Sequence, residues 1–312
     1  MKICVLNGKK VNYDGSVDYS VLGDSVTVHD DCTPADYYGF SDGYDVIVSK
    51  ELPMSYDDIM SLPVSVKLIA EAGTGYNNID LNACRERGIG LINVPAYSSE
   101  RVSHTAIMMM LCFASSMQKQ FSMLANDDRS NFTDKLSVPH FEVNGKTMGV
   151  IGTGNIGKKT IAIGKALDMR VIAYKPGKPN ADVEYVDFDT LLKESDFVFL
   201  HCPLNESTRH MIDAKALSLM KPGACIINTA RGALIDEQAL IDALRENRIG
   251  GACLDVQENE PLAENSPLFE LDNVILTPHM GWKGLETRQR LIGILRDGIA
   301  SFENGGTLNR IV

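Results

Sequence analysis

Residues 147–167 read TMGVIGTGNIGKKTIAIGKAL. The stretch opens with a short apolar run of the kind that forms a buried parallel strand. Three glycines follow in the spacing Gly-x-Gly-x-x-Gly, at Gly152, Gly154 and Gly157. The residues from Asn155 to Leu167 then have the pattern of a helix. The stretch therefore predicts a strand, a tight glycine turn and a helix, which together begin a strand–helix–strand unit.

The three glycines have separate physical roles in such a turn. Gly152 allows the tight turn, Gly154 lets the backbone come close to an anion, and Gly157 lets the helix pack against the strand. The helix N-terminus at Asn155 and Ile156 offers N–H groups to a pyrophosphate. We therefore predict a dinucleotide site at this turn, against the alternative of a purely structural turn.

The end of the next strand bears on the choice of dinucleotide. An acidic residue usually binds a ribose hydroxyl there, but this chain has Lys175, 18 residues past Gly157, followed by Lys178. An ammonium group cannot accept a hydrogen bond from a 2′-hydroxyl, whereas it can pair with a 2′-phosphate. The sequence thus favours NADP over NAD. The alternative is that both lysines are solvated and that NAD is used.

Strand-like runs fall into two groups along the chain. The first group lies near residues 2–6, 25–29, 45–49, 67–70 and 89–93, and the second at 147–152, 170–174, 196–200, 224–229, 251–256 and 273–278. Continuous apolar strands that alternate with helical patterns predict parallel sheets covered on both faces. The fold class is therefore α/β, with two doubly wound parallel-sheet domains.

The segments between and after these groups suggest how the domains are connected. A helix is predicted from Ser98 to about Phe121, a loop over 126–140, and a last helix from after Trp282 to about Phe302 that returns to the first group. The length of 312 residues fits two domains. We predict a discontinuous substrate domain, residues 1–99 and 282–312, into which a Rossmann-type dinucleotide-binding domain, residues 100–281, is inserted.

Charge and composition exclude several classes of partner. Lys and Arg number 30 against 41 Asp and Glu, a net charge of −11, which repels nucleic-acid phosphates and anionic lipids. The longest apolar run, at 106–114, is too short to span a bilayer, and no secretory signal pattern is visible. The seven cysteines include no C-x-x-C pair. We expect a cytoplasmic protein without nucleic-acid, membrane or metal partners.

Reactive side chains follow three strands of the second group. Arg231, Asp255 and His279 stand directly after or at the end of such strands, and Glu260 comes shortly after Asp255. A lone arginine or histidine at such a place is more often a solvated or structural residue. Because parallel strands end at one edge of their sheet, where α/β proteins bind ligands, their co-occurrence predicts a site.

Taken together, these segments resemble the D-isomer-specific 2-hydroxyacid dehydrogenases, and look most like the glycerate dehydrogenase and hydroxypyruvate reductase branch. The resemblance covers nearly the whole chain. Besides the glycine turn it rests on AGTGYNNID (72–80), NVPAYSSERV (93–102), HCPLNESTRHMI (201–212), MKPGACIINTARGALIDEQAL (220–240), GGACLDV (250–256) and TPHMGW (277–282). It implies a flavodoxin-like substrate domain and a Rossmann-type NAD(P)-binding domain.

The resemblance assigns His279 as the acid/base, Glu260 as its carboxylate partner and Arg231 as the substrate-binding cation. Elementary chemistry agrees with these roles. Hydride transfer to a 2-keto acid creates an alkoxide that needs a proton, which a histidine can give near neutral pH. A neighbouring carboxylate favours the protonated ring, and the planar fork of an arginine can pair with the substrate carboxylate.

Further roles follow from the resemblance alone. Backbone N–H groups of residues 73–75 would bind the substrate carboxylate across a cleft between the domains, and Asp255 would hold the nicotinamide carboxamide, with a strand-end cap as the alternative for Asp255. The residues implied in carboxylate binding are Gly73, Thr74 and Gly75, and those implied in lining the cofactor site are Cys202, Pro203, Thr229 and Ala230. Tyr76, Tyr97 and Trp282 are candidates for shaping the pocket or for ordinary packing.

The leading hypothesis is an NAD(P)H-dependent reductase of small 2-keto acids such as hydroxypyruvate or glyoxylate, working reversibly on the D-2-hydroxy acid. By resemblance, a homodimer formed through the linking-helix region is expected. One alternative is a nucleotide-sensing interaction protein like the resembling corepressors, because fold does not fix function. Another is a dehydrogenase of a non-carbon substrate such as phosphite.

Overall fold

The computed structural model describes residues 1–133 and 135–312, and it divides the chain into two compact units. The smaller unit consists of Met1–Ser98 and Trp282–Val312, and the larger unit is Ser99–Gly281. Each unit contains one sheet whose strands all pair in parallel. The predicted α/β fold class with two parallel sheets is confirmed. Asp134, within the predicted loop, lies outside the described residues.

The sheet of the smaller unit has the strand order β2-β1-β3-β4-β5. Its strands are β1 (Ile3–Val5), β2 (Val26–Val28), β3 (Val46–Ser49), β4 (Leu68–Glu71) and β5 (Gly90–Ile92). This is the flavodoxin-like order, in which the direction of winding switches between the first and third strands. The carboxyl ends of β1 and β3 are therefore the expected place for a ligand.

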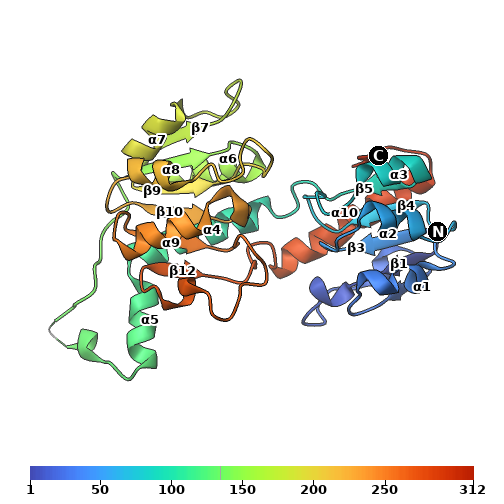
Figure 1. Ribbon diagram of the computed structural model, residues 1–312, viewed down its shortest axis with the longest axis horizontal. Coiled ribbons are helices and arrows are strands. Elements are labelled where there is room, and N and C mark those ends of the chain that lie inside the picture. Colours follow the sequence, from blue (N-terminus) through green and yellow to red (C-terminus); the bar gives the residue numbers. More distant parts are fainter. Residues whose placement is uncertain (134) are drawn as a thin grey trace. The chain divides into compact units, whose positions relative to one another are not determined.

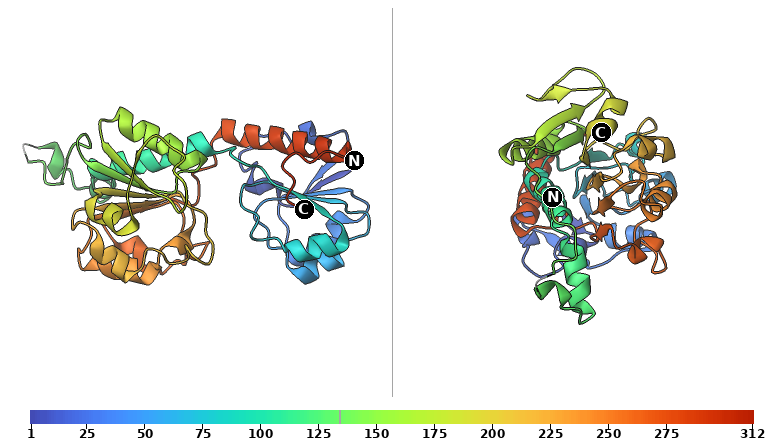
Figure 2. Two further views of the ribbon diagram at one scale, coloured as in Figure 1. Left: turned by 90° about the horizontal axis from the view of Figure 1, so that it is seen from above. Right: turned by 90° about the vertical axis from the view of Figure 1, so that its left-hand side faces the viewer.

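Helices cover both faces of this sheet, as Figure 2 shows for α2 and α3 on one side and α10 on the other. The helices are α1 (Tyr37–Ser41), α2 (Tyr56–Ser61), α3 (Leu81–Arg87) and α10 (Leu285–Glu303), and the 3-10 turns are η1 (Gly8–Lys10), η2 (Tyr19–Leu22) and η3 (Pro34–Asp36). Leu291, Leu295 and Ile299 are buried on one side of α10. Helix α10 belongs to the same compact unit as the first group of strands.

The larger unit has a seven-stranded sheet in the order β12-β11-β10-β9-β6-β7-β8. Its strands are β6 (Thr147–Ile151), β7 (Arg170–Tyr174), β8 (Glu184–Tyr185), β9 (Phe197–Leu200), β10 (Cys225–Asn228), β11 (Gly251–Leu254) and β12 (Val274–Leu276). Figure 1 shows them with their helices. Here the order switches between β6 and β9, so that the glycine turn after β6 faces the loop after β9.

Both faces of this sheet are buried, as the continuous apolar runs predicted. Cys225 and Ile227 pack with α4 and α6 on one face, whereas Ile226 between them packs with α7, α8 and α9 on the other. The helices are α4 (Ser99–Ala114), α5 (Met117–Ala125), α6 (Asn155–Ala166), α7 (Phe188–Glu194), α8 (Ala214–Leu219) and α9 (Glu237–Arg245), with turns η4 (Ser130–Phe132), η5 (Gly232–Leu234) and η6 (Pro267–Glu270).

Two elements differ from the sequence prediction. The single helix expected from residue 98 to 121 is wrong, because the chain breaks between α4 and α5, where Ser116 adopts a left-handed φ of 47°. The hydroxyl of Ser116 donates to the carbonyl of Pro139 at 2.6 Å, a side-chain bond that competes with continuing the helix. Strand β8 was not expected, since two residues give no periodicity to read.

Each helix among the described residues is too short or too polar to cross a membrane. All seven cysteines are free thiols. Asp168 stands in the turn between α6 and β7. Its left-handed φ of 54° is one that aspartate tolerates better than most residues.

Candidate active site

The glycine turn between β6 and α6 leaves no room for side chains at two positions. Gly152 has a φ of +98°, and a Cβ there would lie 2.7 Å from the backbone nitrogen of Cys202. A Cβ on Gly157 would lie 2.0 Å from the carbonyl oxygen of Gly152. Gly154 is the N-cap of α6, so the first N–H groups of that helix point out of the turn toward an incoming anion.

Buried polar atoms around this turn fit a bound dinucleotide. Within the described residues, the hydroxyl of Thr229 and the Nδ1 atom of His201 are buried without a hydrogen-bond partner. Such atoms cost free energy unless a ligand or water satisfies them. Cys202 stands two residues after β9, which pairs with β6, and Thr229 stands one residue after β10, which pairs with β9. The residues present therefore suit the predicted cofactor.

His201 is held neutral by its surroundings. Its Nε2 atom lies 2.9 Å from the hydroxyl of Thr160 on α6, and burial lowers the pKa of the ring to about 4. A neutral ring at this place adds no charge near the glycine turn.

The loop after β7 is tied back to the glycine turn through residues that the sequence did not single out. The Tyr185 hydroxyl donates to Thr153 Oγ1 at 3.1 Å and accepts from the backbone N–H groups of Asn180 and Ala181 at 3.2 Å each. Thr153 also donates to the Asn180 side chain. No sequence motif marks Tyr185, because the folded structure, and not proximity in the sequence, brings it next to Thr153.

Lys175 begins this loop, and its ammonium group donates to the carbonyl of Lys178 at 3.1 Å. Lys175 is half-buried and Lys178 is exposed. Because β7 neighbours β6 in the sheet, both lysines lie beside the glycine turn, on the side where the second phosphate or hydroxyl of an adenosine ribose is bound in such folds.

Arg231 follows β10 and is positioned by the buried side chain of Asn228. The amide of Asn228 donates to the Arg231 carbonyl at 2.8 Å and accepts from the Ala230 N–H at 3.0 Å. The guanidinium Nη1 donates to the Ala230 carbonyl at 2.7 Å. Its Nε and Nη2 atoms donate no hydrogen bond within the described part of the chain, which leaves donors for an anionic ligand.

His279 and Glu260 form an acid/base pair at this sheet edge. The Nδ1 atom of His279 lies 2.8 Å from Oε2 of Glu260, and both side chains are partly exposed. The other carboxylate oxygen of Glu260 accepts from the Gln257 N–H at 3.1 Å. With Nδ1 donating to the carboxylate, Nε2 is the ring atom that can exchange a proton with a ligand.

Asp255 shapes the turn that carries His279. Its buried carboxylate accepts from the Thr277 hydroxyl at 2.5 Å and from the N–H groups of Met280 and Gly281 at 2.9 and 2.8 Å. The Asp255 carbonyl accepts from the His279 N–H at 2.8 Å, and His279 has a left-handed φ of 48°. The strand-end cap is therefore realised, and the nicotinamide contact of Asp255 stays a prediction.

The strand register explains why these residues come together. Asn228, Leu254 and Leu276 end β10, β11 and β12, and they are neighbours across the three strands. The residues that follow them therefore emerge at one edge of the sheet. Arg231 and His279 were predicted for this edge from sequence, and the register brings their segments there.

A second histidine–carboxylate pair lies nearby and was missed from the sequence. His210 Nε2 is 2.7 Å from Oε1 of Glu258, and an Arg209 nitrogen is 3.3 Å from the same oxygen. Glu258 is two residues from Glu260, so the pair joins the loop after β9 to the loop after β11. The spacing of 48 residues between the partners gives no sequence signal.

In the smaller unit, the loop of Gly73, Thr74 and Gly75 follows β4. Among the described residues, the backbone N–H groups of all three form no hydrogen bond, whereas the carbonyls of Gly73 and Thr74 accept from Val94 and Asn93. Successive N–H groups without internal partners make an anion-binding concavity. The loop thus has the donors that the predicted carboxylate site requires.

The aromatic candidates are mostly packing residues. Tyr97 and Trp282 are buried, and their rings meet edge to face with centroids 6.4 Å apart. Tyr76 is partly buried against the core of the smaller unit. Ordinary packing therefore accounts for the burial of Tyr97 and Trp282.

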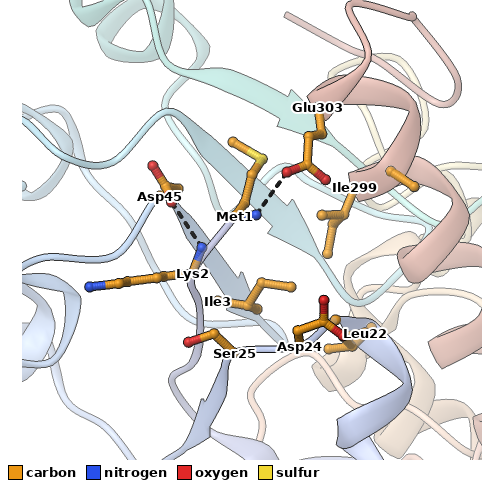
Figure 3. A pocket seen from close by; sticks show the side chains of 11 residues that line it. Met1, Lys2, Ile3, Leu22, Asp24, Ser25, Asp45, Ile299 and Glu303 are labelled. Carbon is orange, nitrogen blue, oxygen red and sulfur yellow. Dashed lines mark hydrogen bonds and ion pairs between the residues drawn. The ribbon is translucent and has the colours of Figure 1, made fainter.

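A hollow of about 520 Å³ in the smaller unit is lined by none of the predicted site residues (Figure 3). Two contacts lie in it: the Met1 ammonium binds Glu303 at 2.8 Å, and Asp45 accepts from the Lys2 backbone N–H at 2.8 Å. These contacts tie the N-terminus to the unit.

Comparisons with known proteins agree with this geometry. Residues 107–281 match the model of the D-isomer specific 2-hydroxyacid dehydrogenase, NAD binding domain. A hydroxypyruvate reductase of Thermotoga maritima is 41% identical over 80% of this chain and 81% of its own length. A hydroxypyruvate reductase of Blautia hydrogenotrophica is 33% identical over 99% of each chain.

A solved structure extends the similarity to the whole fold. The apo-structure of D-lactate dehydrogenase from Escherichia coli is similar with a TM-score of 0.87 and 32% identity, covering 100% of both chains. The sequence resemblance is thus confirmed by relatives and by structure. The chain belongs to the D-isomer specific 2-hydroxyacid dehydrogenase family and is an oxidoreductase with a nicotinamide cofactor.

Proposed function

We propose that this protein reversibly reduces hydroxypyruvate to D-glycerate, or glyoxylate to glycolate. The observation that carries the proposal is the His279–Glu260 pair at 2.8 Å, at the same sheet edge as Arg231. The two hydroxypyruvate reductases that the chain resembles support this choice of substrate. A small 2-keto acid offers both a carbonyl for the histidine and a carboxylate for the arginine.

The protein side of the reaction is proton transfer and charge stabilisation. The nicotinamide cofactor, when bound, supplies or accepts the hydride. We assign His279 Nε2 as the atom that gives a proton to the carbonyl oxygen during reduction and takes it back during oxidation. Glu260 holds the ring by Nδ1 at 2.8 Å, which leaves Nε2 for the proton exchange.

Arg231 is proposed to bind the substrate carboxylate and to polarise the carbonyl. The N–H groups of Gly73, Thr74 and Gly75, which have no partner within the described residues, are proposed to bind the same carboxylate. Both groups are needed in an acidic protein with a net charge of −11, because its long-range field repels the anionic substrate.

The proposed cofactor site comprises the glycine turn, the residues after β9 and β10, Asp255 and Lys175. In full, these residues are Gly152, Gly154, Asn155, Ile156, Gly157, Lys175, Cys202, Pro203, Thr229, Ala230 and Asp255. Thr229 would use its buried hydroxyl, which has no partner among the described residues. Lys175 favours NADP, because its ammonium group can pair with a 2′-phosphate.

The experiment for this cofactor choice compares kcat/KM for NADPH and NADH at saturating hydroxypyruvate. We expect a preference for NADPH that falls about tenfold in Lys175→Ala, the effect of one charge-assisted hydrogen bond. Lys193→Ala, in a helix away from the glycine turn, is the matched control and should keep the ratio. An enzyme that prefers NADH, with a ratio insensitive to Lys175, would show that NAD is the cofactor.

Replacement of the acid/base tests the chemistry itself. His279→Ala should reduce turnover by about 10²–10⁴-fold, the usual contribution of general acid–base catalysis, while cofactor affinity measured by fluorescence titration is retained. His140→Ala, an exposed histidine, serves as the control and should have wild-type turnover. Near wild-type turnover of His279→Ala would refute the assigned mechanism.

A panel of 2-keto acids and phosphite separates the remaining hypotheses. Turnover of hydroxypyruvate or glyoxylate is the expected result. Tight dinucleotide binding without turnover of any 2-keto acid would favour a nucleotide-sensing interaction protein. Oxidation of phosphite alone would point to a non-carbon substrate.

We further propose a homodimer in the cytoplasm. Support for self-association comes from large apolar side chains exposed on α5 and the segment that follows it, namely Phe121, Leu124, Phe132 and Leu136. Figure 1 shows α5 extending away from the sheet of its own unit. Apolar side chains in such numbers on one segment are typical of a protein–protein interface.

A further inference from the structure

Lys50 is a buried cation to which the proposed mechanism gives no role. It directly follows β3, and only 4% of its side chain is exposed. Asn7, which comes after β1, fixes its backbone: the Asn7 amide donates to the Lys50 carbonyl at 2.8 Å and accepts from the Lys50 N–H at 2.9 Å. Lys50 therefore lies at the switch point of the sheet, where folds of this strand order bind ligands.

The ammonium group of Lys50 lies against the start of the carboxylate-binding loop. It is 3.1 Å from the position that a Cβ on Gly73 would occupy, and the Glu71 carboxylate is 3.2 Å from the same position. A side chain at residue 73 would displace one of these groups. Glycine thus brings the loop backbone, with its three N–H groups that have no partner among the described residues, next to a full positive charge.

The charge of Lys50 is kept by its neighbours despite burial. Burial alone would lower the pKa of Lys50, but Tyr97, Glu51 and Glu71 around it raise the pKa above its usual value. Glu51 accepts from the ammonium at 2.6 Å, and the Trp282 ring centroid lies 4.3 Å from it. Burying a charged lysine costs free energy. A charge that is kept at this position therefore indicates a functional role.

We propose that Lys50 is a specificity-determining residue whose ammonium group binds the carboxylate end of the substrate together with the N–H groups of residues 73–75. The proposal rests on the proposed function, since it concerns the substrate of that reaction. A ligand with a second negative charge next to its carboxylate gains most from a nearby cation. Lys50 therefore makes the site prefer dianions such as oxalate over monoanions of the same shape such as oxamate.

The test compares oxalate and oxamate as inhibitors competing with hydroxypyruvate, at saturating cofactor. Lys50→Met keeps an unbranched side chain that is one atom shorter and removes the charge. We expect about a tenfold rise in KM for the keto acid, the value of a charge-assisted hydrogen bond, and a larger loss of oxalate affinity than of oxamate affinity. The KM for the cofactor should stay within about twofold of wild type, since one tenfold step already corresponds to a full hydrogen bond.

Lys10→Met is the matched control. The Lys10 ammonium lies 3.8 Å from Glu51, the same carboxylate that Lys50 binds, but its side chain is 51% exposed. This variant loses an equal charge away from the loop and should keep the oxalate/oxamate ratio of wild type. Lys50→Arg keeps the charge and should keep the preference for oxalate.

An unchanged ratio of oxalate to oxamate affinity in Lys50→Met would overturn the proposal. A loss of oxalate preference in Lys50→Arg as large as that in Lys50→Met would also overturn it, because it would show that Lys50 acts through packing and not through its charge. If Lys50→Met does not fold, the double variant Lys50→Met/Glu71→Gln, which removes buried charge of both signs, takes its place. Fluorescence of the single tryptophan, Trp282, gives oxalate affinity without turnover. The Lys50 proposal can thus fail or succeed separately from the proposed reaction.

Discussion

At the scale of single residues, His201 and His279 illustrate how surroundings divide one residue type into two roles. His279 is partly exposed and paired with Glu260, an environment that supports proton exchange. His201 is enclosed, and one ring nitrogen has no partner within the described residues. Burial lowers the pKa of His201 to about 4, so its ring stays neutral near pH 7. The proposed acid, His279, must by contrast be able to take up and give a proton.

This difference predicts a pH dependence of stability. The unfolded chain binds a proton at His201 below about pH 6.5, whereas the folded protein does so only near pH 4. Stability is therefore complete above pH 6.5 and is lost as the pH falls toward 4, by about 3 kcal/mol for this group. Chemical denaturation of wild type and His201→Asn across this range should differ in slope. The same slope in both proteins would contradict the prediction.

The site residues that the sequence predicted differ from those that it missed in one respect, which is whether strand topology alone positions them. Arg231, Glu260 and His279 each follow a strand, so topology alone brings them to one edge. Lys50 and Tyr185 gain their meaning only from partners such as Gly73 and Thr153, far away in the sequence. No local spacing encodes those contacts, because they depend on how loops pack.

At the scale of elements, the turn after β12 carries the proposed acid in a left-handed conformation that needs support. Asp255 gives that support through the Thr277 hydroxyl and the N–H groups of Met280 and Gly281. A carboxylate accepts at both oxygens, whereas an amide has one accepting oxygen and one donating nitrogen. Replacement by asparagine must therefore leave at least one of these donors facing another donor.

We accordingly predict that Asp255→Asn lowers kcat by about 100-fold, as expected when an acid/base group is misplaced by about 1 Å. Its melting temperature should fall by only a few degrees, since one buried polar contact is worth about 1–3 kcal/mol. Thr277→Val removes one of the three donors and should show a smaller fall in kcat. A variant Asp255→Asn with wild-type kcat would show that the turn is held by other contacts.

The elements themselves could be predicted wherever they were long and apolar. Strands β6, β9, β10 and β11 are continuous buried runs, and the helical patterns between them predict that they pair in parallel. The break between α4 and α5 was missed because Ser115 and Ser116 do not interrupt the apolar pattern enough. Tertiary contact with Pro139 decides the conformation there.

At the scale of the whole molecule, the net charge of −11 limits where anions can bind. Positive potential must be local, and each unit has its own source of it. In the larger unit these are the N-terminus of α6 and Arg231, and in the smaller unit the loop of residues 73–75 with Lys50. The long-range field, by contrast, keeps nucleic acids and other polyanions away.

The last prediction concerns self-association. Phe121 and Phe132 are 61% and 73% exposed, and burying each against a second copy would stabilise a dimer by about 1.5–3 kcal/mol. Phe121→Glu/Phe132→Glu should therefore convert a particle of twice 34.2 kDa into a monomer, as measured by light scattering or sedimentation. Val64→Glu replaces a residue that is 96% exposed in the smaller unit and should leave the particle mass unchanged. A measured particle mass of 34.2 kDa for the wild-type protein at micromolar concentration would contradict the proposed dimer. A double variant with the same particle mass as a dimeric wild type would show that α5 and the segment that follows it are not the interface.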